Sequence, residues 1–390
     1  MDQMEEGKKH AKEAKRASLA VLVVATILAV SQVWAQPAGH AGSSAGSSPP
    51  VESPDAKWTF AVSGDSRNCG DIVMPAIAAD ALKHHPAFYW HLGDLRATYT
   101  FDEDMLHEPE HLAHPMTISY YLGNEWDDFV DNQIRPFGTV PFFVGIGNHE
   151  TIPPKTRDQF IMEFMDWLDT PILREQRLKD NSKDYHVRTY YHWIEGGIDF
   201  INLDNATEDQ FDSAQVAWLE RVLSRDEADT AVRTIVVGMH RALPESISRG
   251  HSMNESAQGT ESGRRVYDDL LKAQNEAHKR LYVLASHSHF YMEGIYNTDY
   301  WRDHGGVLPG WIVGTAGAVR YALPEGSNQA KQALTKVYGY LLGTVNPNGG
   351  SEGEIRFEFH EIKEPQVPAA VVDRFKPDFV HWCFDKNTAF

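Results

Sequence analysis

Short apolar runs that stop abruptly at glycine, aspartate, asparagine or histidine recur along the chain from residue 58 onward. Runs with the length and apolar content of buried strands lie at 58–62, 87–92, 140–144, 234–239 and 281–285. Between some of them, apolar residues recur at helical spacing, as at 71–84, 215–223 and 263–278. Strands that alternate with helices predict an α/β fold.

Further strand patterns follow in the second half of the chain. The runs 189–194 and 198–203 flank Glu195-Gly196-Gly197, which predicts a hairpin. Four later runs, at 290–296, 310–313, 338–345 and 354–359, make the end of the domain rich in predicted strands.

Metal-binding types of side chain follow five of the predicted strands. They are Asp65, Asp94, Asn148 with His149, His240, and the pair His287 and His289. Parallel strands put their carboxyl ends at one edge of a sheet, so these side chains are expected to converge. Carboxylates, imidazoles and an amide oxygen suit two metal ions, and a carboxylate shared between the ions offsets their mutual repulsion.

The charge balance narrows the class of partner. Asp and Glu number 55 against 36 Lys and Arg, which gives a formal net charge of −19. A nucleic acid or an anionic membrane surface favours a basic face, so neither is expected as the main partner. An anionic substrate needs local compensation, which bound cations or a few arginines supply.

The first 54 residues predict export. Basic residues between Lys8 and Arg16 precede the apolar run 17–30, and Val33-Trp34-Ala35 then offers small residues at two positions, 33 and 35. This order predicts a signal peptide over 1–35, with an uncleaved anchor as the alternative. Residues 36–54 are mostly Ala, Gly, Ser and Pro, which predicts a disordered linker. We therefore expect a periplasmic or secreted protein, with no stable membrane partner unless the leader is uncleaved.

Five motifs in order carry a resemblance to a known family. They are Gly64-Asp65, Gly93-Asp94, Gly147-Asn148-His149-Glu150, Val237-Gly238-Met239-His240 and Ser286-His287-Ser288-His289. The set resembles the calcineurin-like metallophosphoesterase superfamily and, in its Gly-Asn-His-Glu and Val-x-x-His forms, the purple acid phosphatases. The resemblance implies a four-layer αββα sandwich of two mixed β-sheets flanked by helices, forming a single catalytic domain over 55–363.

The resemblance also implies a role for each residue. Asp65 and His289 would bind a first metal, Asp94 would bridge, and Asn148, His240 and His287 would bind a second. His149 would act on the substrate, with Glu150 orienting it through a hydrogen bond. The metals, divalent or trivalent Mn, Fe or Zn, would lower the pKa of a bridging water that attacks phosphorus. No organic cofactor is implied.

Two departures from the family pattern concern the first metal. Arg67 stands where the family usually has a histidine, and Ala97 stands where the purple enzymes have a tyrosine, with Tyr99 close but at another offset. Three alternatives follow for the first metal: it is under-coordinated, it recruits Tyr99 or extra water as a ligand, or it is absent. Arg67 and Arg96 are candidates to grip a substrate phosphate, and ordinary structural ion pairs are the alternative.

The expected activity is hydrolysis of a small phosphorylated substrate, with a phosphomonoester favoured over a phosphodiester. The alternative is an exported protein of the same fold that binds metal or phosphate with weakened turnover. Residues 95–139 are expected to cap the site, and 364–390 to form a C-terminal tail. The sequence leaves open whether Cys69 and Cys383 pair, and it leaves the oligomeric state open.

Overall fold

The computed structural model describes residues 56–207 and 210–389. The predicted leader and linker, residues 1–54, lie outside the described residues, so their assignment stays a prediction. Among the described helices, none combines the length and the apolar content that a membrane span needs.

One sheet has five strands in the order β12-β11-β1-β2-β3. Its strands are β1 (Trp58–Ser63), β2 (Tyr89–His91), β3 (Phe142–Val144), β11 (Tyr338–Val345) and β12 (Ile355–Ile362). The first three are parallel, whereas β11 runs antiparallel to both of its neighbours. The sheet is therefore mixed, and it joins the two ends of the domain.

The other sheet has seven strands in the order β10-β8-β9-β7-β6-β5-β4. They are β4 (Tyr191–Glu195), β5 (Ile198–Asn202), β6 (Thr234–Gly238), β7 (Arg280–Ala285), β8 (Tyr291–Glu293), β9 (Gly310–Val313) and β10 (Gln332–Leu334). Strands β5, β6, β7 and β9 are parallel, and β4 pairs with β5 as the predicted antiparallel hairpin.

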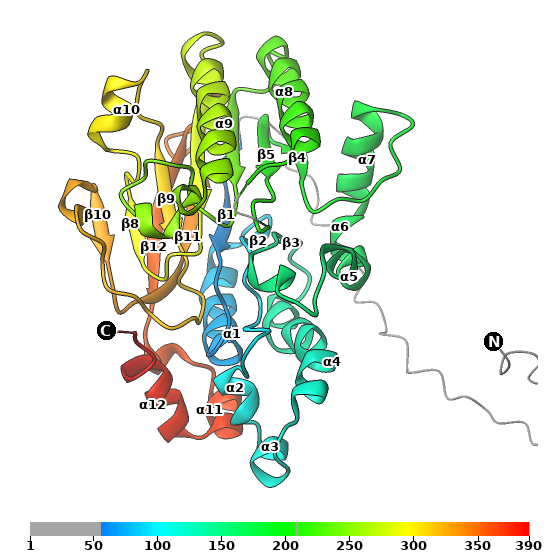
Figure 1. The fold of residues 1–390 in the computed structure, drawn as a ribbon, viewed down its shortest axis with the longest axis vertical. Coiled ribbons are helices and arrows are strands. Elements are labelled where there is room, and N and C mark those ends of the chain that lie inside the picture. Colours follow the sequence, from blue (N-terminus) through cyan, green and yellow to red (C-terminus); the bar gives the residue numbers. More distant parts are fainter. Residues whose placement is uncertain (1–55, 208–209, 390) are drawn as a thin grey trace, which may run out of the picture. The chain divides into compact units, whose positions relative to one another are not determined.

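Helices cover the outer faces of both sheets (Figure 1). Helix α1 (Gly70–Ala81) packs on the five-stranded sheet, and α8 (Ser213–Ala228) and α9 (Ala257–Asn275) cover the seven-stranded one. The remaining α-helices of the described residues are α2 (Glu103–Leu106), α3 (Pro109–Ala113), α4 (Ile118–Phe129), α5 (Arg157–Glu163), α6 (Met165–Leu168), α7 (Pro171–Asp180), α10 (Asp299–Asp303), α11 (Ala369–Phe375) and α12 (Pro377–Asp385).

Aromatic side chains fill the space between the two sheets. Phe60 of β1 meets Phe200 of β5 with ring centroids 5.1 Å apart, and Phe143 of β3 stacks on Trp193 of β4 at 3.9 Å. Such rings bury large apolar areas, and inward-facing residues of two stacked sheets form a common core. The predicted αββα sandwich of two mixed sheets is confirmed.

The segments expected as a cap and a tail contain helices of their own. Residues 95–139 form α2, α3 and α4, and the last described residues form α11 and α12. Cys69, just before α1, forms a disulfide with Cys383 of α12, with their Cα atoms 6.0 Å apart. The C-terminal helices are therefore tied to the loop that follows β1.

Candidate metal centre

Loops at the carboxyl ends of strands from both sheets bring the predicted ligands together. Asp65 follows β1, Asp94 follows β2, His240 follows β6, and His287 follows β7. The backbone φ angles of Asp65, Asp94 and His287 are positive, at 59°, 59° and 64°. Non-glycine residues rarely adopt this region, and such backbone tends to occur at functional sites.

One group of ligand atoms surrounds the ring of His240. Its Nε2 lies 3.0 Å from Asn148 Oδ1, 3.0 Å from His287 Nδ1 and 3.2 Å from Asp94 Oδ1. The Nδ1 of His240 is 3.0 Å from the carbonyl oxygen of Leu92, which fixes the proton on that nitrogen. The Nε2 lone pair then faces three other acceptors.

A bound cation suits this group of atoms. Burial and the nearby His240 hold the pKa of His287 well below its usual range, so this imidazole is neutral. An amide oxygen, a carboxylate oxygen and an imidazole nitrogen lie within 3.2 Å of His240 Nε2, and although burial opposes protonation of His240, the charge of Asp94 raises its pKa, so this group of acceptors favours a positive charge at its centre. These residues therefore fit a metal ion.

A second group contains Asp65, Asp94 and His289, all buried. His289 Nε2 is 3.1 Å from Asp65 Oδ1, and its Nδ1 is 2.6 Å from the carbonyl oxygen of Val319. The other Asp65 oxygen accepts from the backbone N–H of His287 at 2.6 Å and from the hydroxyl of Ser286. A histidine held through one ring nitrogen by a carbonyl is the usual arrangement of a metal-binding histidine.

Asp94 belongs to both groups, as the predicted bridge requires. Burial alone would raise its pKa, but His149 and His240 outweigh burial and hold the pKa well below its usual range. Its Oδ2 is buried without a hydrogen-bond partner. A buried carboxylate oxygen with no donor is costly, and a metal would satisfy it.

The loop that carries Asp94 packs closely against the loop that carries Gly147, which holds Asp94 in place. Gly93 has φ 94°, and a Cβ on Gly147 would lie 2.2 Å from Asp94 Oδ1. Both glycines are therefore needed, because a Cβ on Gly147 would displace the Asp94 carboxylate and a Cβ on Gly93 would clash with the backbone of Gly147.

Arg67 lies beside the second group. Its Nη2 is 3.3 Å from His289 Nε2, its Nε is 3.7 Å from Asp94 Oδ2, and it is only 9% exposed. A guanidinium group stays protonated and cannot donate a lone pair. The position that the family pattern gives to a metal-binding histidine thus holds a positive charge among the ligands.

His149 lies next to Asp94, with Nε2 3.6 Å from Asp94 Oδ2. Its Nδ1 is 2.6 Å from the carbonyl oxygen of Ala97, and the half-exposed ring of Tyr99 packs against it at 5.1 Å. Burial lowers the pKa of His149, opposed by Asp94. Ala97, which lacks the expected tyrosine ring, orients His149 through its backbone.

Glu150 acts differently from the expectation. Its carboxylate accepts backbone N–H groups of Asp94 at 2.9 Å, Leu95 at 2.8 Å and Gly147 at 2.7 Å. In the described part of the chain, the ring of His149 pairs with the carbonyl oxygen of Ala97 and with Asp94, and not with Glu150. The prediction that Glu150 orients His149 is therefore corrected: Glu150 holds the two loops that carry Asp94 and Asn148.

The prediction that Arg96 is a candidate to bind a substrate phosphate is also corrected. Its guanidinium is fully buried and binds Asp71 at 2.6 Å, Asp104 at 3.0 Å and Asp128. A side chain bound by three carboxylates is not available to a substrate. The alternative, a structural ion pair, describes Arg96, whose role is to join α1, α2 and α4.

Two residues near the centre have no signal in the sequence. Tyr321 stacks on His289 with ring centroids 4.0 Å apart, and Asn205 bonds the backbone of Arg241 at 2.8 and 3.0 Å. Tyr321 belongs to an irregular segment, and Asp204-Asn205 has the composition of an ordinary turn. Only the folded chain places them beside the ligands.

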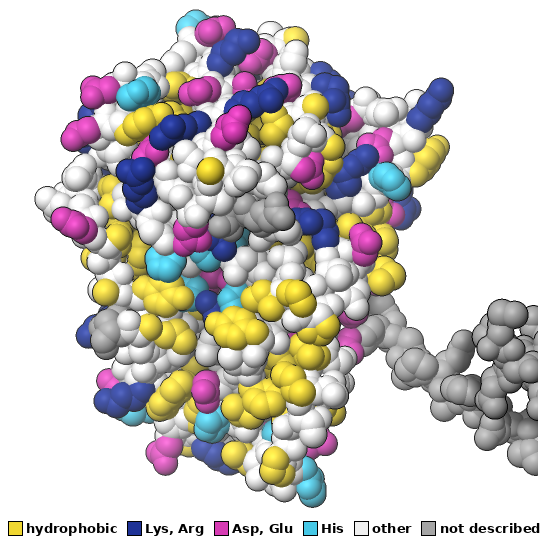
Figure 2. Space-filling view, in the orientation of Figure 1, with side chains coloured by type: hydrophobic (Ala, Val, Ile, Leu, Met, Phe, Trp, Pro, Cys, Tyr) yellow, Lys and Arg dark blue, Asp and Glu magenta, His cyan; other side chains and the backbone are white. Residues whose placement is uncertain are grey.

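The centre reaches the surface. Figure 2 shows several histidine side chains gathered near the middle of the face around a basic side chain, with hydrophobic side chains along the border. His287 and Asn148 are partly exposed, whereas Asp65, Asp94, His240 and His289 are buried. A small ligand can therefore approach the centre from one side.

A solved purple acid phosphatase has the same fold. The enzyme PPD1 from seeds of yellow lupin (Lupinus luteus) matches 83% of this chain and 54% of its own, with a TM-score of 0.55 and 18% sequence identity. The chain thus spans about half the length of the lupin enzyme. At this identity the match shows the fold, so the resemblance found in the sequence is confirmed at the level of fold.

Two looser matches were also found. GAP50, the anchor in the inner membrane complex of Plasmodium, matches 85% of this chain and 96% of its own with a TM-score of 0.43 and 14% identity. PhoD matches 87% of this chain and 77% of its own, with a TM-score of 0.46 and 15% sequence identity. No protein-family model and no curated protein matches the chain.

Proposed function

We propose that the protein is an exported, metal-dependent phosphoesterase that acts on a small phosphomonoester. The observation that carries the proposal is the convergence of Asp65, Asp94, Asn148, His240, His287 and His289 into two adjoining groups of ligand atoms that share Asp94. The fold in common with a purple acid phosphatase supports the same conclusion.

Each ligand has a proposed place. Asn148, His240 and His287 would hold one metal, Asp65 and His289 the other, and Asp94 both. When bound, the metals supply positive charge for the phosphate oxygens and lower the pKa of a water molecule. The carbonyl groups of Leu92 and Val319 keep His240 and His289 in the ring orientation and tautomer that binding needs.

His149 is proposed to handle the proton of the leaving group. Its Nδ1 is engaged by the carbonyl of Ala97, so Nε2 is the ring atom available to the substrate. That atom lies 3.6 Å from Asp94 Oδ2, outside ordinary hydrogen-bond distance. We therefore place His149 beside the metals and outside their ligand set.

Arg67 is proposed to contact the substrate phosphate. Its guanidinium lies at the ligand group of Asp65 and His289, where a bound phosphate needs positive charge. A fixed cation at this point supplies part of the charge that a fully occupied first metal site would supply. The first site is then the weaker of the two.

The same arginine favours a second candidate function. A guanidinium group 3.3 Å from His289 Nε2 repels a metal bound by that nitrogen. A protein that retains one metal, or phosphate alone, with weakened turnover would follow from this repulsion.

A substrate panel separates the two candidates. The purified protein is loaded in turn with Mn, Fe or Zn, its metal content is measured, and hydrolysis of a phosphomonoester and a phosphodiester is followed. Hydrolysis of the monoester at the higher kcat/KM supports the proposal. A faster diesterase rate contradicts the monoester preference, and metal binding without turnover under all three metals supports the second candidate.

A further inference from the structure

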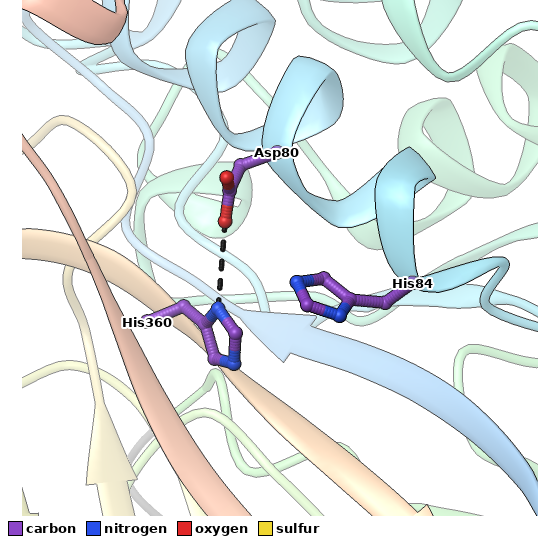
Figure 3. Close-up of side chains that lie close together, drawn as sticks. All are labelled: Asp80, His84 and His360. Carbon is purple, nitrogen blue, oxygen red and sulfur yellow. Dashed lines mark ion pairs between the residues drawn. The ribbon is translucent and has the colours of Figure 1, made fainter.

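Three side chains outside the catalytic centre gather at the far end of α1. Asp80 lies in the last turn of α1, His84 in the short turn that follows it, and His360 in β12, the outer strand of the five-stranded sheet. Figure 3 shows the three side chains facing one another. About ten residues of helix, roughly 15 Å, separate Asp80 from the start of α1, which follows the loop that carries Asp65 and Arg67.

Helical spacing and sheet pairing bring the group together. Asp80 and His84 are four residues apart, so they share one face of the helical turn. One ligand atom from each of Asp80, His84 and His360 lies within 4.8 Å of the other two. Asp80 Oδ2 is 3.4 Å from His360 Nδ1, and the two imidazole rings meet edge to face with centroids 4.7 Å apart.

The 3.4 Å separation suits two ligands of one ion. It is longer than a charge-assisted N–H···O bond, whose usual length is about 2.8 Å. Two ligands of a tetrahedral ion at about 2.05 Å are separated by roughly 3.3 Å. The carboxylate and the imidazole are therefore spaced as a shared zinc ion requires.

The charges at this group also suit a cation. Burial opposes ionisation of Asp80, but hydrogen bonds from Lys83 and Tyr340 outweigh it and lower the pKa of Asp80. Burial, followed by the charge of His360, lowers the pKa of His84. At neutral pH the group therefore offers one ionised carboxylate and at least one neutral imidazole as ligands for a cation.

Access for an ion is open. The side chains of Asp80 and His360 are 17% and 24% exposed, so they are held by their surroundings yet reach solvent. Glu358, two residues before His360, adds a further negative charge near His84. Lys83 binds the other oxygen of Asp80, at 3.0 Å, from a side chain that is 68% exposed and free to move away.

We propose that Asp80, His84 and His360 form a separate binding site for a borderline divalent cation such as Zn²⁺. Two imidazoles and one carboxylate are the ligand set that zinc prefers, and water completes the coordination. The ion would fasten the end of α1 to the outer strand β12. This site is independent of the proposed phosphoesterase activity, since none of its residues belongs to the catalytic centre.

Zinc content tests this proposal. The full-length protein, His84→Ala, His360→Ala and the control His85→Asn are equilibrated with Zn²⁺, dialysed and analysed for bound metal. His85 is exposed, adjacent and outside the group, and asparagine tolerates its positive φ of 49°. We expect each alanine variant to bind one zinc fewer than the wild type, and His85→Asn to bind the same number.

The two alanine variants lie on different elements, so a folding defect in one leaves the other informative. Phosphoesterase activity should be unchanged in both, which separates this site from the catalytic centre. Equal zinc content in the wild type and the alanine variants would overturn the proposal. So would crystals soaked in zinc that show anomalous scattering at the catalytic centre and none between Asp80 and His360.

Discussion

Asp94 is the side chain on which the proposed centre depends most. It belongs to both groups of ligand atoms, and its Oδ2 has no hydrogen-bond donor. The loops that hold it are fixed by Glu150, which accepts three backbone N–H groups, and by glycines at 93 and 147. The Asp94 carboxylate is thus held through its loop and through Oδ1, which accepts the backbone N–H of His149 at 3.0 Å, and its Oδ2 is left for a cation.

We expect Arg67 to limit how strongly the proposed first metal is held. Replacing it with alanine removes a positive charge 3.3 Å from His289 Nε2 and 3.7 Å from Asp94 Oδ2. We expect Arg67→Ala to bind metal at Asp65 and His289 about tenfold more tightly, a gain of about 1.4 kcal/mol. Its KM for a phosphomonoester should rise, because the proposed contact with phosphate would be lost. Metal titration and steady-state kinetics check both effects.

Arg67→Lys is the matched control because it keeps the charge. It should retain the metal affinity of the wild type and lose only part of the substrate affinity. An Arg67→Ala variant with unchanged metal affinity would show that the guanidinium does not compete with the first metal.

At the residue scale, the sequence predicted which residue types follow the strand ends. It did not predict where the side chain of each residue points. The ligand residues were readable because each follows an apolar strand. Arg96 follows the same strand end, yet Asp71, Asp104 and Asp128 from three helices draw it into the interior. Asp71 and Asp128 lie 25 and 32 residues from Arg96 along the chain, so no local pattern in the sequence showed these pairings.

At the scale of elements, the strand ends explain why the site forms. The carboxyl ends of parallel strands from both sheets lie beside one another. The loops after β1 and β2 therefore supply carboxylates, and the loops after β6 and β7 supply imidazoles. These strands were predicted because each is a short apolar run. Helix α7 and strand β10 were missed, since neither has an apolar periodicity that stands out: α7 buries only Leu173, and β10 is three residues of partly exposed edge.

An ionic group joins α7 to the seven-stranded sheet. His192 of β4 lies 2.6 Å from Asp180 of α7 and 2.7 Å from Asp199 of β5, and Asp180 also binds Arg225 of α8. Burial opposes protonation, but the two carboxylates outweigh it and raise the pKa of His192 to about 10. His192 therefore carries a charge at neutral pH.

The raised pKa predicts how stability depends on pH. A group whose folded pKa exceeds its unfolded value of about 6.5 contributes fully below that pH and loses its contribution as the pH rises towards 10. We expect His192→Gln to lower the free energy of unfolding by about 3 kcal/mol at pH 6 and by much less at pH 10. Urea unfolding at several pH values measures this difference.

His186→Gln is the control, because His186 is exposed and its ring joins no such group. Its unfolding free energy should match that of the wild type at every pH. A His192→Gln effect that stays constant from pH 6 to pH 10 would show that His192 is not charged in the folded protein.

At the scale of the whole molecule, one disulfide links distant parts of the domain. Cys69 and Cys383 are 314 residues apart in sequence, and they join the loop after β1 to α12. The sequence left this pairing open because spacing alone does not give a distance between two cysteines. In the folded sandwich the C-terminal helices pack near α1, which brings Cys383 within bonding distance of Cys69.

Removing the disulfide should weaken the whole domain. We expect the double variant Cys69→Ser with Cys383→Ser to lose about 2–5 kcal/mol of unfolding free energy, because the unfolded chain is no longer cross-linked. Urea unfolding measures the loss, and a reducing agent should lower the wild type to the level of the variant while leaving the variant unchanged. Identical midpoints for wild type and variant would mean that the link carries no stability.

Six side chains are proposed to hold metal, and His149 is proposed to act on the substrate from outside their ligand set. Metal content and phosphomonoesterase rate, measured in the same samples of wild type, Asp94→Asn and His149→Ala, test these two roles most directly. We predict that Asp94→Asn loses both metal and activity, whereas His149→Ala keeps its metal and loses about 100-fold or more in kcat. Full activity in His149→Ala, or full metal content in Asp94→Asn, would contradict the account.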